Sequence, residues 1–111
     1  IGYARTRSFN AFYDPESIRS EGRNTTVRII LNYLEPQSEN GSMRKALSSV
    51  QSITFDCPGS NYRLDRYVMF SDANGAGATI SDSGAYIDYK AEMKPVPPDS
   101  INQILYMRIC R

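Results

Sequence analysis

The sequence has no histidine, no tryptophan and only two cysteines among its 111 residues. The absence of histidine excludes a Ser-His-Asp triad, a Cys-His pair and any metal site that needs an imidazole ligand. Gly75 and Gly77 are not followed by a helical pattern, so no phosphate-binding loop is predicted. We therefore expect no catalytic residue, no metal and no cofactor, and a protein that is not an enzyme.

Neither charge of one sign nor a long apolar run dominates the chain. It carries 13 basic and 12 acidic residues, a net charge of +1, and its arginines are scattered. A nucleic-acid-binding protein usually has a basic block or face, so we expect no nucleic-acid partner. No apolar run approaches the ~20 residues of a membrane-spanning helix, so no transmembrane segment is expected. The chain opens at Ile1 without a signal-peptide pattern, which we interpret as a processed form.

The two cysteines, Cys57 and Cys110, lie far apart in the sequence. They are too distant for a CxxC redox pair and too few for a zinc site. The favoured interpretation is one disulfide that fixes the C-terminal segment to a strand, which implies export from the reducing cytosol. The alternative is two buried free thiols in a cytosolic protein, because free cysteine is often a small core residue.

Short segments of alternating polar and apolar residues, separated by turn residues, predict a mainly β chain. The strongest segment is 27–34, in which the odd-numbered apolar side chains share one face. Its many β-branched residues favour a central strand. Pro36 and Asn40-Gly41 predict a loop over 34–42, and a short helical turn within 38–47 stays open. The other predicted strands cover 9–13, 50–57, 62–70, 78–81 and 86–93.

The segment 62–70 is irregular. Strict alternation puts Arg63 and Tyr67 on one face and Arg66 on the opposite, apolar face, so we expect a bulge or an imperfect strand there. Residues 72–77 contain Asn74, Gly75 and Gly77, and they predict a hairpin with positive φ angles.

The C-terminal segment is predicted to be a helix. Three prolines at 95, 97 and 98 form a stiff linker, which we expect to lie outside the sheet. Asp99 or Ser100 then supplies an N-cap, and apolar residues follow at helical spacing up to Cys110. A final strand stays open as the alternative. The predicted fold is α+β and mainly β: an antiparallel meander sheet of about five to seven strands, with the C-terminal helix packed on one face, in a single domain over 1–111.

Two groups of side chains are candidates for function. Arg63, Arg66 and Tyr67 belong to the only dense basic and aromatic cluster, and the favoured interpretation is ordinary strand-face charges paired with acidic residues at 65, 88 or 92. The alternative, which makes these three residues candidates for partner binding, is a recognition surface for an acidic or extended protein partner. The carboxylate pairs Asp14/Glu16 and Asp72/Asp82 are interpreted as solvated turn residues, and only a cleft that brought such a pair together would indicate a small hydrolase.

The order of features along the chain resembles the surface-adhesin protein E family of Gram-negative bacteria, over nearly the whole length. The most distinctive part is Asp56-Cys57 together with a distant terminal cysteine that follows a Pro-Asp-Ser cap. The matching features are Phe12-Tyr13-Asp14-Pro15-Glu16-Ser17-Ile18-Arg19, the strand 27–34, Asp56-Cys57, Arg63 and Arg66, the segment 67–71, Gly75 and Gly77, Tyr89, Pro98-Asp99-Ser100 and Cys110.

The resemblance implies an exported, disulfide-linked β-sheet domain in the periplasm or on the outer-membrane surface. It also implies a non-enzymatic binding module, an adhesin that contacts host matrix or serum proteins. The alternative is a periplasmic structural or assembly protein that binds another envelope component. An exposed edge strand would also allow two copies to pair as a homodimer.

Overall fold

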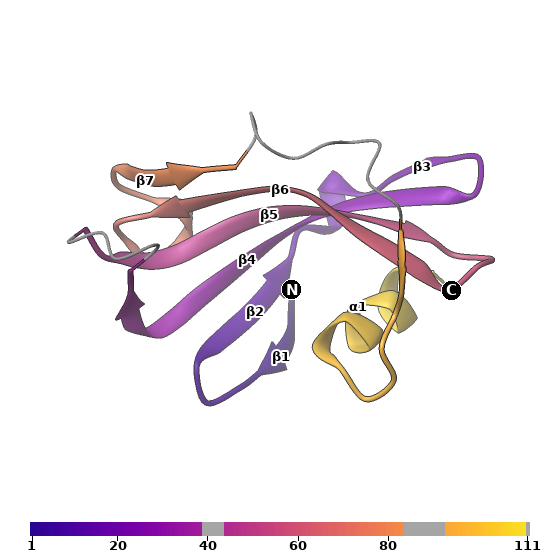
Figure 1. Cartoon of the computed structure of the whole chain (residues 1–111), viewed down its shortest axis with the longest axis horizontal. Helices are drawn as coiled ribbons and strands as arrows, with labels where there is room; N and C mark the ends of the chain where they lie inside the picture. The colour runs from indigo at the N-terminus through magenta and orange to yellow at the C-terminus, as the bar shows by residue number, and fades with distance from the viewer. Residues whose placement is uncertain (39–43, 84–92, 111) are drawn as a thin grey trace.

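A strongly twisted antiparallel sheet forms most of the molecule, and a C-terminal helix lies across one end of it (Figure 1). The computed structural model describes residues 1–38, 44–83 and 93–110. Within those ranges the sheet has eight strands: its main path runs β1-β2-β4-β5-β6-β7, β3 pairs with β4, and β8 pairs with β6. The strands are β1 (Gly2–Arg5), β2 (Phe9–Tyr13), β3 (Arg19–Glu21), β4 (Asn24–Gln37), β5 (Ala46–Asp56), β6 (Asn61–Phe70), β7 (Thr79–Asp82) and β8 (Lys94–Pro95). The predicted mainly β fold with a C-terminal helix is confirmed.

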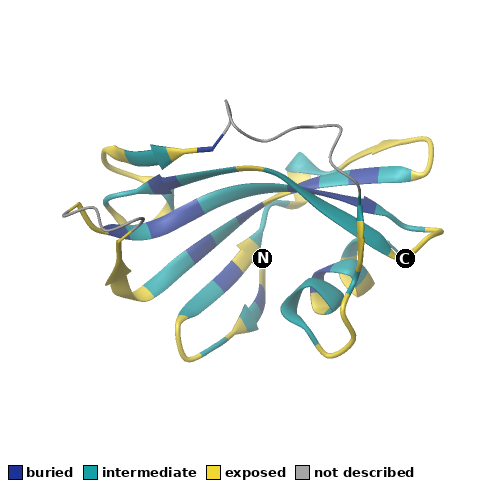
Figure 2. Ribbon diagram, viewed as in Figure 1, coloured by how far each residue is buried: buried dark blue, intermediate teal, exposed yellow. Residues whose placement is uncertain are grey.

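The two longest strands, β4 and β5, form the centre of the sheet. Figure 2 shows buried residues recurring along both strands. The predicted face of β4 is confirmed, since Val27, Ile29 and Leu31 are all buried. Two boundaries were wrong, because β4 continues through Pro36 and β5 already begins at Ala46, where a helical turn had been an open alternative.

Pro36 is tolerated in β4 because the ladder to β5 is interrupted there. The register between the two strands shifts between Asn32 and Gln37, so no regular β4–β5 pair requires an amide proton from Pro36. Residues 39–43 of the predicted loop lie outside the described residues.

A β-bulge in β6 changes the predicted faces of that strand. Ser52 of β5 pairs with Arg66, and the next residue of β5 pairs with Leu64, so Asp65 is an extra residue. The predicted irregularity is confirmed, but the face assignment was wrong. Arg63 and Arg66 lie on the same face and Tyr67 on the opposite one, because one inserted residue reverses the alternation beyond it.

The short elements at the two edges were only partly predicted. β1 and β3 were not expected, whereas β7 matches the predicted strand 78–81 closely. Pro95 was placed outside the sheet, yet it belongs to β8 and pairs with Asn61. A two-residue strand at the edge accommodates proline, because its missing N–H does not interrupt a central ladder. The predicted strand 86–93 falls almost entirely on residues 84–92, outside the described part of the chain.

The loop between β6 and β7 folds back onto the sheet. It contains a 3-10 turn, η2 (Ala73–Gly75), with the predicted positive φ angles at Asn74, Gly75 and Gly77. The Ser48 hydroxyl of β5 donates to the carbonyl of Asp72 and accepts from the amide of Gly75. A side chain at Gly75 would meet Val50 at 2.8 Å, so this position combines a left-handed backbone with a close approach to β5.

The helix α1 (Ile101–Ile109) completes the core. Ser100 caps it, accepting from the Gln103 amide at 3.1 Å, so the helical prediction and one of its two proposed caps are confirmed. Leu105 is fully buried in the same cluster as Val27, Ile53 and Phe55. No helix in the described ranges is both long and apolar enough to cross a bilayer.

A disulfide joins the end of α1 to the end of β5. Cys57 and Cys110 are bridged, with their Cα atoms 5.4 Å apart. The hydroxyl of Tyr106 donates to the Cys57 carbonyl at 2.6 Å, and its ring lies 5.8 Å from that of Phe55. Covalent, polar and aromatic contacts therefore converge where the helix meets the sheet.

Candidate partner-binding surfaces

The predicted cluster of Arg63, Arg66 and Tyr67 is divided between the two faces of the sheet. The face that carries Tyr67 is the one on which α1 packs, since Gln51, its partner in β5, shares a face with Ile53 and Phe55. Both arginines project from the other face. A single flat partner therefore cannot contact all three side chains.

Both arginines have acidic partners on their own face. Arg63 Nε lies 2.7 Å from Asp65 Oδ1, and Arg66 Nε donates to Asp82 Oδ1 at 3.0 Å. The hydrogen bond to Asp82 raises the pKa of Arg66 above its usual value. Asp65 was an expected partner and Asp82 was not, while residues 88 and 92 lie outside the described ranges. Contact of these arginines with a partner protein stays a prediction.

A polar cavity of about 380 Å³ lies beside Arg63. The guanidinium of Arg19 within it is already used, since it donates to the carbonyls of Glu16 and Ile18. The guanidinium groups of Arg63 and Arg19 are therefore both engaged in contacts within the protein. The lining residues are Arg19, Glu21, Asn24, Thr26, Thr54 and Arg63.

Tyr67 lines a different cavity, of about 400 Å³, on the face that carries α1. Tyr33 of β4 and Gln51 of β5 contribute to it, together with Leu64 and Met69 of β6. Hydroxyl, amide and apolar groups alternate across it. Such a mixed surface suits contact with a protein better than binding of a single ion.

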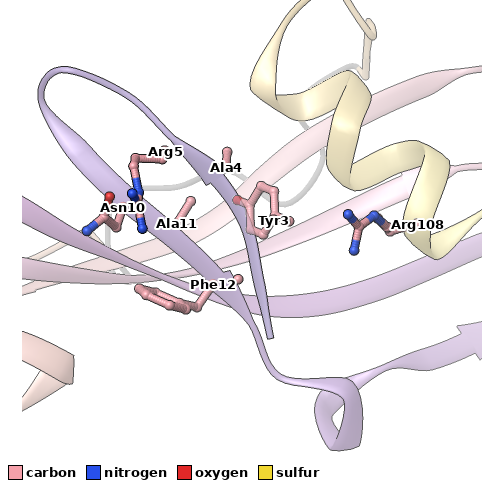
Figure 3. Close-up of a pocket in the computed structure, with 8 residues that line it drawn as sticks. Tyr3, Ala4, Arg5, Asn10, Ala11, Phe12 and Arg108 are labelled. Atoms are coloured by element: carbon pink, nitrogen blue, oxygen red, sulfur yellow. The ribbon is translucent and has the colours of Figure 1, made fainter.

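A third cavity, of about 320 Å³, lies at the β1 edge of the sheet (Figure 3). The whole of β1 lines it, with three residues of β2, and Arg108 reaches toward Tyr3 from the last turn of α1. Sequence reasoning missed this site, because a four-residue strand with two small residues has no useful periodicity. The lining residues are Gly2, Tyr3, Ala4, Arg5, Asn10, Ala11, Phe12 and Arg108.

Two polar atoms of this β1 pocket lack a hydrogen-bond partner among the described residues. They are the hydroxyl of Tyr3, whose residue is only 7% exposed, and Oδ1 of Asn10. Burial raises the pKa of Tyr3 to about 12, so its hydroxyl stays protonated and can donate. The pocket therefore holds one unused donor and one unused acceptor.

Two of the four carboxylates considered from sequence have structural roles in the described part of the chain. Asp14 caps the 3-10 turn η1 (Pro15–Ser17) by accepting from the Glu16 amide, and Asp82 pairs with Arg66. Among the described residues, no group of three or more cysteine, aspartate or glutamate side chains could hold a metal ion.

Comparison with known proteins gives one family and one fold. The family model described as Surface-adhesin protein E matches residues 2–111. A structure of Haemophilus influenzae protein E, in its crystal form II, superposes with a TM-score of 0.72 at 16% identity, covering 97% of this chain and 91% of that chain. Protein E from non-typeable Haemophilus influenzae gives a TM-score of 0.70 at 17% identity, covering 98% and 74%. The search of curated proteins found no match.

Proposed function

The chain belongs to the surface-adhesin protein E family, and from this membership we propose that it is an exported, non-enzymatic protein of the Gram-negative envelope that adheres to host matrix or serum proteins. The observation that carries the proposal is the family match over residues 2–111. We further propose that residues 1–111 act as one binding domain.

The disulfide supports export. A bridge between Cys57 and Cys110 persists in an oxidising compartment and is rare in the reducing cytosol. Of the two exported locations, the outer surface is the one from which an adhesin can reach a host protein.

The character of the surfaces supports a protein partner. The cavities beside Arg63, Tyr67 and the β1 edge are each lined by more than one element, and those beside Tyr67 and the β1 edge mix polar with apolar side chains. Protein interfaces have this composition, with aromatic and arginine side chains enriched at their centres. We propose that the adhesive contact uses one of these surfaces, with Arg63, Arg66 and Tyr67 as candidate residues.

A binding assay tests the adhesive function. The purified, oxidised protein should bind immobilised laminin, vitronectin or plasminogen saturably, and an albumin-coated surface should give no specific signal. Absence of saturable binding to all three would contradict the proposal. Specific capture of one envelope component from extracts of the source cells, in the same experiment, would instead favour the periplasmic alternative.

A further inference from the structure

We propose that the β1 pocket binds an extended acidic segment of a protein partner, whose carboxylates pair with Arg5 and Arg108 while its backbone lies along the edge of β1. The inference rests on the proposed adhesive function and adds the site and the chemistry of the ligand. Three independent features of the pocket carry it: its charge, its unused polar atoms and its exposed strand edge.

Charge is the first feature. Residues 1–13 and 101–110 contain the arginines at 5, 7 and 108 and no acidic residue, so the hairpin and the helix beside it are uniformly positive. Arg5 and Arg108 are exposed, and neither has an ion-pair partner in the described ranges. By contrast, Arg23, Arg63 and Arg66 are each paired with an aspartate. Arg5 and Arg108 therefore give the β1 pocket two positive groups that no acidic side chain of the described residues compensates, which suits an acidic partner.

The unused polar atoms are the second feature. The Tyr3 hydroxyl needs an acceptor and Asn10 Oδ1 needs a donor, and both residues line the pocket. An extended peptide offers both kinds of group at short intervals, because its carbonyls and carboxylates accept and its amides donate. Phe12, which is 37% exposed and lines the same pocket, adds an apolar contact that peptide side chains can match. A polysulfated sugar, rich in acceptors and poor in apolar groups, fits less well.

The strand edge is the third feature. β1 ends the main path of the sheet and, within the described residues, pairs with β2 alone. An exposed edge accepts a further strand through backbone hydrogen bonds, with side chains supplying specificity. The four-residue length of β1 and the irregular register between Gly2 and Ala4 limit the added strand to a short segment. A second copy of β1 would bring arginines together, so an acidic segment is favoured over self-pairing.

A peptide titration tests the proposal with the full, oxidised chain. The probe is a short capped peptide with two adjacent glutamates between valines, and its control has glutamine in place of glutamate. Adjacent side chains of an added strand point to opposite faces, which allows one carboxylate to reach Arg5, on the face opposite α1, and the other to reach Arg108 of α1. Amide chemical shifts recorded by NMR should change in β1, β2 and the last turn of α1. The acidic peptide should bind at least about ten-fold more tightly than its control, and added salt should weaken that binding.

Charge-matched variants locate the contact. The double substitution R5Q/R108Q should weaken binding of the acidic peptide about ten-fold or more. The matched control is K45Q/K94Q, which removes two exposed positive charges outside the pocket and should change affinity less than about two-fold.

The substitution Tyr3→Phe tests the unused hydroxyl of the pocket. It should raise the melting temperature of the free protein, because it removes a buried hydroxyl without a partner, and it should also weaken binding of the acidic peptide.

Several results would overturn the inference. Equal affinity for the glutamate and glutamine peptides would do so, as would shifts confined to residues outside the pocket. Tighter binding of a heparin fragment at these residues would assign the site to a polysaccharide, and R5Q/R108Q-sensitive self-association would assign it to a second copy. Binding to immobilised host proteins is a separate readout: if it fails while the peptide still binds, the adhesive function is contradicted and the pocket is not.

Discussion

At the scale of single residues, Asp56 holds together the turn between β5 and β6. Its carboxylate accepts from Arg23 Nε at 3.1 Å and from the Gly59 amide at 3.2 Å. The hydrogen bond from Arg23 is the main reason that the pKa of Asp56 lies below its usual value. Asp56 directly precedes Cys57, which is bridged to Cys110 at the end of α1. The conformation of this turn therefore affects the position at which the helix is attached to the sheet.

The lowered pKa predicts a particular response to acid. An aspartate in the unfolded chain titrates near pH 4. Because the pKa of Asp56 is lower in the folded protein, its charge stabilises the fold above about pH 4, and this contribution disappears as the pH falls through the folded value. In thermal melts at pH 7 and pH 3, Asp56→Asn should lose less melting temperature on acidification than the wild type. Arg23→Gln should behave in the same way, and an unchanged pH response in both variants would contradict the assignment.

Two neighbouring helix residues provide a matched test of the core. Leu105 is fully buried beneath α1, whereas Ile104 is 41% exposed. Leu105→Ala should lower the free energy of unfolding by about 2–5 kcal/mol, because it leaves a cavity in the shared cluster. Ile104→Ala should cost less than about 1 kcal/mol. Urea unfolding monitored by circular dichroism measures both, and equal losses would show that the helix packs in another orientation.

At the scale of elements, the local sequence pattern was sufficient to predict a strand or helix where apolar residues recur at a regular spacing. β2, β4, β5 and α1 were predicted because apolar spacing, turn residues and the Ser100 cap all agree. β1, β3 and β8 have two to four residues each, too few for any period, and their pairing depends on contacts with distant strands. The bulge in β6 was expected, but its position depends on the register with β5, which the sequence of β6 alone does not contain.

The disulfide is the element-scale feature with the clearest energetic prediction. C57A/C110A should lower the free energy of unfolding by about 2–4 kcal/mol, because the open chain has more conformational freedom when unfolded. The Tyr106 hydrogen bond and the burial of Leu105 remain, so the helix should stay docked in the folded state. Denaturant unfolding gives the loss, and NMR shifts of α1 report docking. Release of the helix in the folded double variant would contradict this account.

At the scale of the whole molecule, the sheet presents its candidate surfaces in different directions. Arg63 and Arg66 share a face, Tyr67 lies on the opposite face, and the β1 pocket lies at an edge. The sequence was enough to identify Arg63, Arg66 and Tyr67 as candidates, because they lie close together along one strand. It could not nominate the β1 pocket, because Arg108 meets β1 only after the helix has folded back against the sheet.

This separation predicts how variants divide in the host-protein assay. Since one partner docks against one surface, we expect at most one of the variants R63Q/R66Q and Tyr67→Ala to weaken binding, and neither of them if the partner docks in the β1 pocket. The affected variant should lose about ten-fold or more if its residues lie at the centre of the interface. The unaffected one serves as the folding control. Equal losses in both, with native circular dichroism spectra, would contradict docking on a single face.

The extra residue in β6 also matters for comparing this chain with its relatives. In an alignment with a relative that lacks the bulge, the one-residue gap belongs opposite Asp65. If the gap is put anywhere else, some residues of β6 are assigned to the wrong side of the sheet. A binding role transferred between homologues through such an alignment would then name residues that point away from the ligand.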